Sequence, residues 1–145
     1  MTRDIVEARR HVRMTDESES LLHSSRAPIV ILPRAVEYDL PQDVAPSTGT
    51  LGVMLPYTPL HHILFEDAEY TALVMTSGNV GDEPIAYTDE AAFEQLGTIA
   101  DAFLTHDRPI HMRTDDSVVR CEGATTILSR RSRGYAPEPI KLVEP

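Results

Sequence analysis

Arginine is concentrated near the C-terminal end of this chain, where six of them fall between Arg108 and Arg133. From His106 to Gly134 six arginines face four acidic residues, whereas the whole chain has 13 basic and 23 acidic residues. Guanidinium groups match phosphate oxygens through two parallel hydrogen bonds. This local excess of arginine therefore predicts an anionic ligand, most simply a phosphate or a nucleotide.

Three of these arginines, Arg130, Arg131 and Arg133, directly follow a run of β type. Because side chains alternate along an extended segment, we expect Arg131 and Arg133 to share one face and Arg130 to take the other. We further expect at least one of these faces to meet phosphates beside Ser77 and Asn79.

The tripeptide Ser77-Gly78-Asn79, preceded by Thr76, follows what we expect to be a buried strand. Ligands of open α/β sheets bind where strands end, and glycine lets the backbone approach a ligand closely. The serine hydroxyl and the asparagine amide would supply neutral hydrogen bonds to phosphate. The alternative is a plain turn, which is the commoner role of such a tripeptide when it stands alone.

Asp115 and Asp116 stand side by side before an apolar run that begins after Ser117. Adjacent carboxylates could hold Mg²⁺, which proteins bind through one or two carboxylates together with substrate phosphates. They could equally cap a turn or pair with Arg113 and Arg120, and we favour this ion-pair interpretation. Ser117 is kept as a candidate phosphate contact.

The histidines and the cysteine give little support to a metal centre or a disulfide. His61 and His62 are neighbours, so on a helix they point about 100° apart, and His106 and His111 lack helical i, i+4 spacing. The single Cys121 excludes an internal disulfide and a multi-cysteine zinc site. No Walker loop, glycine fingerprint or catalytic triad stands out.

Composition narrows the class of protein. With 145 residues, 41% of them hydrophobic, the chain has the size of one ordinary globular domain. No apolar run reaches membrane-spanning length, and the charged N-terminus does not resemble a signal peptide. A net charge of −10 argues against bulk nucleic-acid or anionic-membrane binding. Together these features predict a cytoplasmic protein without a membrane partner.

Hydrophobic periodicity and capping residues predict strands that alternate with helices. Helices are expected after an N-cap at Thr2, after a capping box made by Asp16 and Glu19, after Thr58-Pro59 and after Thr88. A long loop is expected over residues 35–49. Strands are expected at residues 28–32, 52–55, 72–76, 102–105, 117–121 and 125–129. The clearest core strand is 72–76, and the last strands follow one another without helices between them. The order of elements favours an α/β fold with a mixed sheet.

Four strings of the sequence together resemble one family. They are Gly52-Val-Met-Leu-Pro-Tyr-Thr-Pro-Leu-His61, Met75-Thr-Ser-Gly-Asn79 with Glu83-Pro-Ile85, Asp115-Asp-Ser-Val-Val-Arg120, and Arg130-Arg-Ser-Arg-Gly-Tyr-Ala-Pro137. They resemble the YrdC-like domain of HypF-type hydrogenase maturation carbamoyltransferases, from about Arg3 to Ile140. The resemblance implies a twisted mixed sheet with flanking helices.

The resemblance also implies a reaction. The domain would bind ATP with Mg²⁺ and condense it with carbamate derived from carbamoyl phosphate, giving carbamoyl-adenylate. A transferase domain would pass the carbamoyl group to the C-terminal cysteine of a partner maturation protein, where it becomes a cyanide ligand of the [NiFe] centre. Implied phosphate contacts are Ser77, Asn79, Ser117, Arg130, Arg131 and Arg133; candidates for the carbamoyl or adenylate pocket are Pro56, Tyr57, His61, Thr76 and Gly78.

The chain departs from the family pattern at its start. Members open the domain with a glycine-rich stretch and a lysine/arginine motif that contacts ATP, and Met1 lies downstream of both. We therefore expect residues 1–145 to be a partial YrdC-like domain, without acylphosphatase, zinc-finger or transferase segments, and inactive by itself. Lost strands would expose a sheet edge, which predicts a homodimer through that edge.

Two other functions remain open. Threonylcarbamoyl-adenylate synthases, which modify tRNA, share the serine-x-asparagine motif, but they typically have one arginine before a proline-glycine pair where this chain has Arg-Arg-Ser-Arg-Gly-Tyr. A non-catalytic nucleotide-binding or interaction module is the second alternative.

Overall fold

The computed structural model describes residues 1–37, 40–123 and 125–140. The chain forms two compact units. The first unit comprises Met1–Val74 and Asp116–Pro145, and the second comprises Met75–Asp115. The second unit is thus an insertion between two parts of the first.

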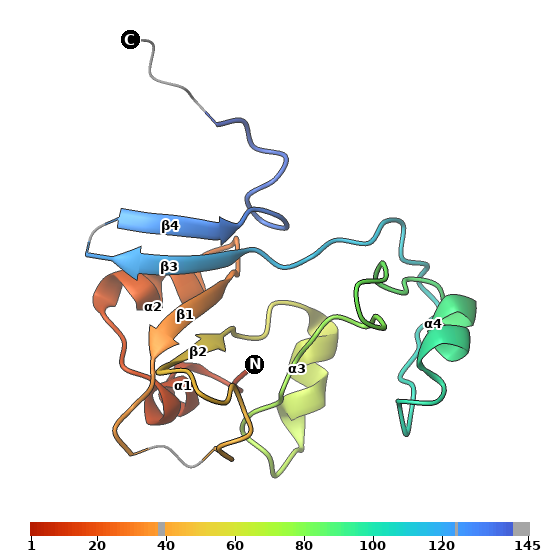
Figure 1. Ribbon diagram of the computed structural model, residues 1–145, viewed down its shortest axis with the longest axis horizontal. Helices are drawn as coiled ribbons and strands as arrows, with labels where there is room; N and C mark the ends of the chain where they lie inside the picture. Colours follow the sequence, from red (N-terminus) through yellow and green to blue (C-terminus); the bar gives the residue numbers. More distant parts are fainter. Residues whose placement is uncertain (38–39, 124, 141–145) are drawn as a thin grey trace. The chain divides into compact units, whose positions relative to one another are not determined.

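A four-stranded mixed sheet organises the first unit (Figure 1). Its strands are β1 (Ile29–Pro33), β2 (Thr50–Val53), β3 (Val118–Glu122) and β4 (Thr125–Arg130), in the order β2-β1-β3-β4. β1 pairs with β3 in parallel, while the β1–β2 and β3–β4 pairs are antiparallel. The expected mixed sheet is therefore confirmed, and each of these four strands falls within about two residues of its predicted range.

The core of the first unit lies where two helices cover this sheet. α2 (Asp16–His23) lies against β1 and β3, as Figure 1 shows, and α1 (Ile5–His11) precedes it. Val30 and Val119 face each other across the parallel pair and are fully buried. The remaining buried residues of this core come from both helices, from β1 and β2 and from the C-terminal segment: Ala8, Val12, Leu22, Leu32, Leu51, Val53 and Tyr135.

Both N-terminal helices form where capping residues predict them, but the caps are different residues. Asp4, not Thr2, caps α1 by accepting a hydrogen bond from the Glu7 N–H. The capping box of α2 is made by Thr15 and Ser18, one residue before the predicted Asp16–Glu19 pair. Hydroxyl and carboxylate side chains can all cap a helix, so neighbouring candidates compete, and burial of Ser18 favours the pair observed.

Two predicted strands, at residues 72–76 and 102–105, are absent. Ala72 makes a single bridge with Thr2, and Val74, two residues later, is 77% exposed. Residues 102–105 form no strand at all. An apolar run becomes a strand only when a neighbouring strand accepts its backbone hydrogen bonds. Beyond the two bonds between Met1 and Leu73, the described residues offer the 72–76 segment no such neighbour.

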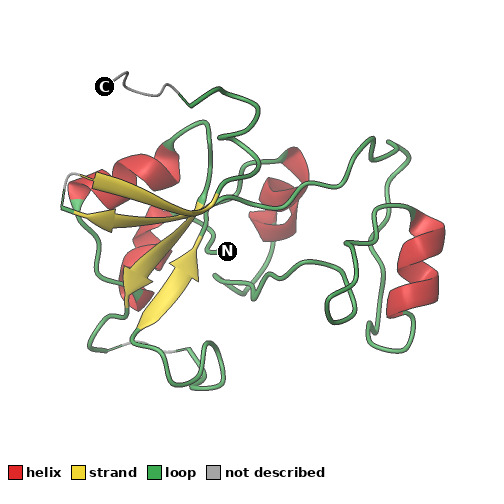
Figure 2. Ribbon diagram, turned by 45° about the horizontal axis from the view of Figure 1, so that its top comes forward, coloured by secondary structure: helices red, strands yellow, loops and turns green. Residues whose placement is uncertain are grey.

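The second unit contains one helix, α4 (Asp89–Leu96), and otherwise consists of loops (Figure 2). Thr88 caps this helix as predicted, by accepting a hydrogen bond from the Ala91 N–H. Every residue from 75 to 115 is described, and none of them is buried. Apolar side chains such as Phe93, Leu104 and Ile110 are more than half exposed, so the second unit has no core of its own.

β2 and β4 are the edge strands of the sheet. All residues of β4 except the half-buried Ile127 are exposed. The homodimer through a sheet edge remains a prediction. Among the described residues no helix is long and apolar enough to cross a membrane.

Candidate functional site

Tyr57 and His61 come together at one end of the sheet in the first unit. The chain leaves β2, passes Pro56 and Tyr57, and enters α3 (Pro59–Glu66), which Thr58 caps as predicted. The first turn of this helix brings His61 back to Tyr57. Their rings meet edge to face with centroids 4.7 Å apart, and the Tyr57 N–H donates to His61 Nδ1 over 3.5 Å.

Arg133 and Asp116 reach the same end of the sheet from β4 and β3. The guanidinium of Arg133 lies over the Tyr57 ring, 3.7 Å from its centroid. Its Nε and Nη2 donate to Asp116 Oδ1 over 2.9 and 2.7 Å, and the Tyr57 hydroxyl donates to the same oxygen over 3.3 Å. We call Tyr57, His61, Asp116 and Arg133 the sheet-end cluster.

The sheet-end cluster is also tied to the start of β1. Arg133 Nη2 donates to the Ala27 carbonyl over 2.8 Å, and Nη1 donates to the Arg26 carbonyl over 3.4 Å. The next residue, Gly134, has a φ of +85°, and a Cβ added there would lie 2.3 Å from the Arg26 carbonyl oxygen. Glycine is required here by both its backbone angle and the close approach.

The Ser117 side chain lies next to the sheet-end cluster and is hydrogen-bonded to the backbone there. It is fully buried. Its hydroxyl donates to the Arg133 carbonyl over 2.9 Å and accepts from the Ser132 N–H over 2.8 Å. A hydrogen bond donated to phosphate would require this hydroxyl to give up the Arg133 carbonyl, because a hydroxyl has a single proton to donate.

Burial and charge shift the pKa values of both rings in the cluster. Burial, and then the negative charge of Asp116, raise the pKa of Tyr57 above its usual value, opposed by Arg133. Burial lowers the pKa of His61, reinforced by the positive charges of Arg133 and His62 and opposed by Asp116. His61 is therefore held in its neutral form near pH 7, facing a phenol that keeps its proton.

Acid is expected to destabilise the first unit partly through His61. Because burial lowers the pKa of folded His61 below 6.5, the unfolded chain takes up this proton at higher pH than the folded chain does. The stability that neutral His61 contributes is complete above pH 6.5 and is lost as pH falls through its folded pKa. Urea denaturation from pH 7.5 to 5 should therefore show a smaller loss of stability in His61→Asn than in the unchanged chain.

Asparagine is suitable at position 61 because its Oδ1 can accept the Tyr57 N–H as Nδ1 does. The matched control is His62→Asn, on the exposed neighbour along the same helix. A pH dependence that is reduced equally by both substitutions would contradict the assignment to His61.

The other arginines of the basic region do not form the expected alternating row. β4 ends at Arg130, and Arg131 turns away to donate to the Tyr135 and Glu138 carbonyls. Arg120 pairs with Glu122 over 2.6 Å, both of them exposed on β3. The prediction that Arg131 and Arg133 share one face of a strand is therefore wrong, because local carbonyls and carboxylates compete for these guanidinium groups. Phosphate contacts by Arg130, Arg131 and Arg133 remain predictions.

The Ser77-Gly78-Asn79 segment belongs to the second unit and does not follow a strand, since the strand at 72–76 is absent. The Ser77 hydroxyl donates to Asn79 Oδ1 over 2.6 Å, and Asn79 Nδ2 donates to the Gly81 carbonyl over 2.7 Å. The observed geometry is that of a self-bonded turn, as in the alternative interpretation. Thr76 and Ser77 are exposed, so a ligand could reach them.

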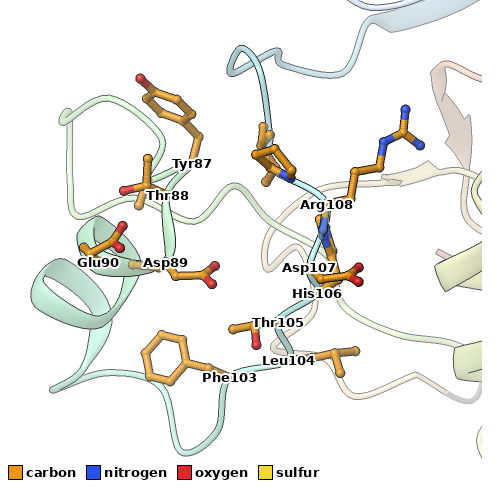
Figure 3. Close-up of a pocket in the computed structure, with 14 residues that line it drawn as sticks. Tyr87, Thr88, Asp89, Glu90, Phe103, Leu104, Thr105, His106, Asp107 and Arg108 are labelled. Atoms are coloured by element: carbon orange, nitrogen blue, oxygen red, sulfur yellow. Dashed lines mark hydrogen bonds between the residues drawn. The ribbon is translucent and has the colours of Figure 1, made fainter.

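The second unit also has a cleft of about 520 Å³ (Figure 3). One wall is the segment that leads into α4, including Tyr87 and Asp89, and the other is the segment from Phe103 to Ile110. Figure 3 shows the Asp89 carboxylate directed into the space and the Arg108 guanidinium directed away from it. Acidic side chains disfavour a triphosphate, so the cleft is a poorer nucleotide site than the sheet-end cluster. None of the predicted site residues lines it.

Asp116 does not fit the Mg²⁺ role considered for it. Its Oδ1 already receives three hydrogen bonds, two of them from a cation. Asp116 is instead ion-paired, with Arg133 in place of the expected Arg113 or Arg120. Asp115 lies at the end of the second unit. Among the described residues no three His, Cys, Asp or Glu side chains are grouped so as to hold a metal ion.

Sequence reasoning missed the Arg26 and Ala27 carbonyls, which fix Arg133, and the constrained Gly134. Backbone carbonyls have no side-chain signature, so no pattern could reveal the first two. The glycine directly after the arginine group was the available sign of a close backbone approach.

Comparison with known proteins agrees with this fold. The Sua5/YciO/YrdC family, described as "Telomere recombination", matches residues 1–132. Carbamoyltransferase HypF of Synechocystis is 43% identical over 93% of this chain, and HypF of Rhodobacter capsulatus is 45% identical over 92%. The chain spans 18% and 17% of the length of these two curated relatives.

Two solved structures match as well. Full-length HypF in a phosphate- and nucleotide-bound form has a TM-score of 0.91 and 45% identity, covering 97% of this chain and 22% of that one. HypF of T. kodakarensis has a TM-score of 0.92 and 41% identity, covering 97% of this chain and 18% of that one. The chain therefore belongs to the Sua5/YciO/YrdC family and, within it, is similar to the YrdC-like segment of HypF carbamoyltransferases.

Proposed function

We propose that this chain is the nucleotide-binding, adenylate-forming segment of a HypF-type carbamoyltransferase. The observation that carries the proposal is the likeness, at 45% identity, to a HypF described as phosphate- and nucleotide-bound. In the proposed reaction a carbamate oxygen forms a bond to the α-phosphorus of ATP. The bond from the α-phosphorus to the oxygen that bridges it to the β-phosphorus breaks, and pyrophosphate leaves with the electron pair of that bond. The carbamate would come from carbamoyl phosphate.

The product, carbamoyl-adenylate, is an activated carbamoyl group. In the complete protein it would pass to the C-terminal cysteine of a hydrogenase maturation partner and supply the cyanide ligand of a [NiFe] centre. Since this chain spans under a fifth of its curated relatives, that whole sequence is proposed for a protein of their length. Mg²⁺ would enter with the phosphates of ATP. The two curated relatives are both HypF proteins, which favours this reading over tRNA modification.

The sheet-end cluster supports the proposal chemically. Neutral His61 and the protonated Tyr57 offer a wall that carries no charge of its own, suited to a planar carbamoyl or purine group. The exposed Ser77 and the half-buried Asn79 are the neutral donors that the family resemblance assigns to phosphate. Each of these two sets is proposed separately as a nucleotide contact.

Binding of ATP to the purified chain tests the proposal. We expect saturable binding in ligand-observed NMR titrations, and we expect Tyr57→Ala to weaken it about tenfold, because an aromatic wall is lost. Tyr87→Ala is the matched control, since Tyr87 lines the acidic cleft and its exposure, 39%, is close to the 36% of Tyr57. Absence of saturable binding, or a loss caused by Tyr87→Ala and not by Tyr57→Ala, would contradict the proposed site.

A further inference from the structure

Arg133 uses most of its hydrogen-bonding capacity within the chain. A guanidinium has five N–H donors, and those of Arg133 make two bonds to Asp116 and one to each of two carbonyls, Arg26 and Ala27. Its side chain is 25% exposed, and its charge is compensated by Asp116 at 2.7 Å. A phosphate would have to displace these partners before it could bind Arg133 with two parallel bonds.

The partners of Arg133 come from separate segments that meet at one end of the sheet. Arg26 and Ala27 precede β1, Asp116 precedes β3, and Tyr57 follows β2. Arg133 itself follows β4. A planar side chain held from several directions fixes the position of the ring against which it stacks. That ring is Tyr57, whose hydroxyl is held by the same Asp116 oxygen.

His61 depends on this arrangement in turn. Its Nδ1 accepts the Tyr57 N–H, and its ring packs against the edge of the Tyr57 ring. A displacement of Tyr57 therefore displaces His61 as well. The order of dependence runs from Asp116 to Arg133, then to Tyr57, and finally to His61.

From this order we infer that Asp116 and Arg133 are positioning residues, which hold the Tyr57–His61 wall in place for the nucleotide and do not themselves bind its phosphates. The inference rests on the proposed function, in which that wall contacts ATP. It reverses the expectation that Arg133 is a phosphate ligand. In chemical terms, position 133 needs a planar guanidinium with several hydrogen-bond donors to hold the wall, and a positive charge alone is not sufficient.

Two substitutions separate positioning from phosphate binding. Arg133→Lys keeps the charge but loses the planar fork and the stacking. If Arg133 positions the wall, this variant should bind ATP about tenfold more weakly, and the ring NMR signals of Tyr57 and His61 should shift. If Arg133 meets phosphate as a charge, ATP binding should be retained within about threefold, with those ring signals unchanged.

The two roles predict opposite changes in ATP affinity for Asp116→Asn. Removing a carboxylate beside a phosphate-binding arginine should tighten ATP binding, because a competing anion is lost. Removing a positioning carboxylate should weaken ATP binding and shift the same ring signals. Tighter binding by Asp116→Asn would therefore overturn the inference, as would unchanged ring signals in Arg133→Lys.

The control is Arg120→Lys, an equal change on β3 at an ion pair whose two side chains are 52% and 57% exposed. It should alter neither ATP binding nor the rings. The amide NMR spectrum of each variant shows whether the variant is folded. If Arg133→Lys does not fold, Asp116→Asn provides the test. An unchanged chain that binds no ATP would refute the proposed function and, with it, the role assigned to the wall. Shifted rings in a variant that binds ATP normally would refute the positioning role alone.

Discussion

Replacing Gly134 with alanine is expected to lower the free energy of unfolding of the first unit by about 2–4 kcal/mol. Two costs add at this position. The φ of +85° lies where L-residues are strained, and the new Cβ would stand 2.3 Å from the Arg26 carbonyl oxygen. The obstacle is backbone, so it cannot rotate away as a side chain could. Urea denaturation followed by circular dichroism measures the loss.

Gly123→Ala is the matched control, since it separates the two costs. Gly123 also has a positive φ, +58°, but a Cβ there would meet no heavy atom within 4 Å. We expect it to cost about 1 kcal/mol, the conformational term alone. Equal losses for the two variants would show that the approach to Arg26 is not tight in solution.

Ser117→Ala should cost about 1–3 kcal/mol, because it leaves two partly buried backbone groups without this partner. The Ser132 N–H would lose its acceptor and the Arg133 carbonyl would lose its donor. Chemical denaturation again gives the loss. Ser129→Ala, at an exposed position of β4, should remain within about 0.5 kcal/mol of the unchanged chain.

The same substitution decides between two roles for Ser117. If the hydroxyl is structural, Ser117→Ala loses stability, and any loss of ATP affinity follows from disturbance of Arg133. If it leaves its partners to bind phosphate, affinity should fall while the free energy of unfolding changes little. The buried hydroxyl favours the first result.

Much of the first unit could be predicted from local patterns. The continuous apolar run at β1 and the sequence Thr58-Pro59 before α3 each carry their own structural signal, and both elements form as expected. Pro59 lacks the N–H that a first helical turn leaves unbonded, and Thr58 supplies a capping hydroxyl. Such signals act over a few residues, so no partner elsewhere in the chain is needed to interpret them.

Features that depend on a distant partner could not be predicted. Residues 72–76 have the composition of a core strand, but a strand also needs a neighbour, and among the described residues only Met1 makes main-chain hydrogen bonds to this segment. The sheet-end cluster could not be predicted from the sequence for the same reason. Asp116 was expected to pair with an arginine close in sequence, but the fold brings Arg133 to it. The residue types predicted that Asp116 would pair with an arginine, but which arginine it meets is determined by the topology of the sheet.

The parallel pairing of β1 with β3 also constrains how the first unit folds. These strands join at the centre of the sheet, yet residues 34–117 separate them in sequence and include the whole second unit. The β3–β4 hairpin closes through a short connection, whereas pairing of β1 with β3 must close a long loop. The chain entropy lost in closing that loop opposes the pairing until the contacts between the two strands have formed. We therefore expect the hairpin to form early and the central pair late. Until that late step, the apolar faces of Val30 and Val119 stay open to other chains, so the interval before central pairing is when aggregation competes with folding.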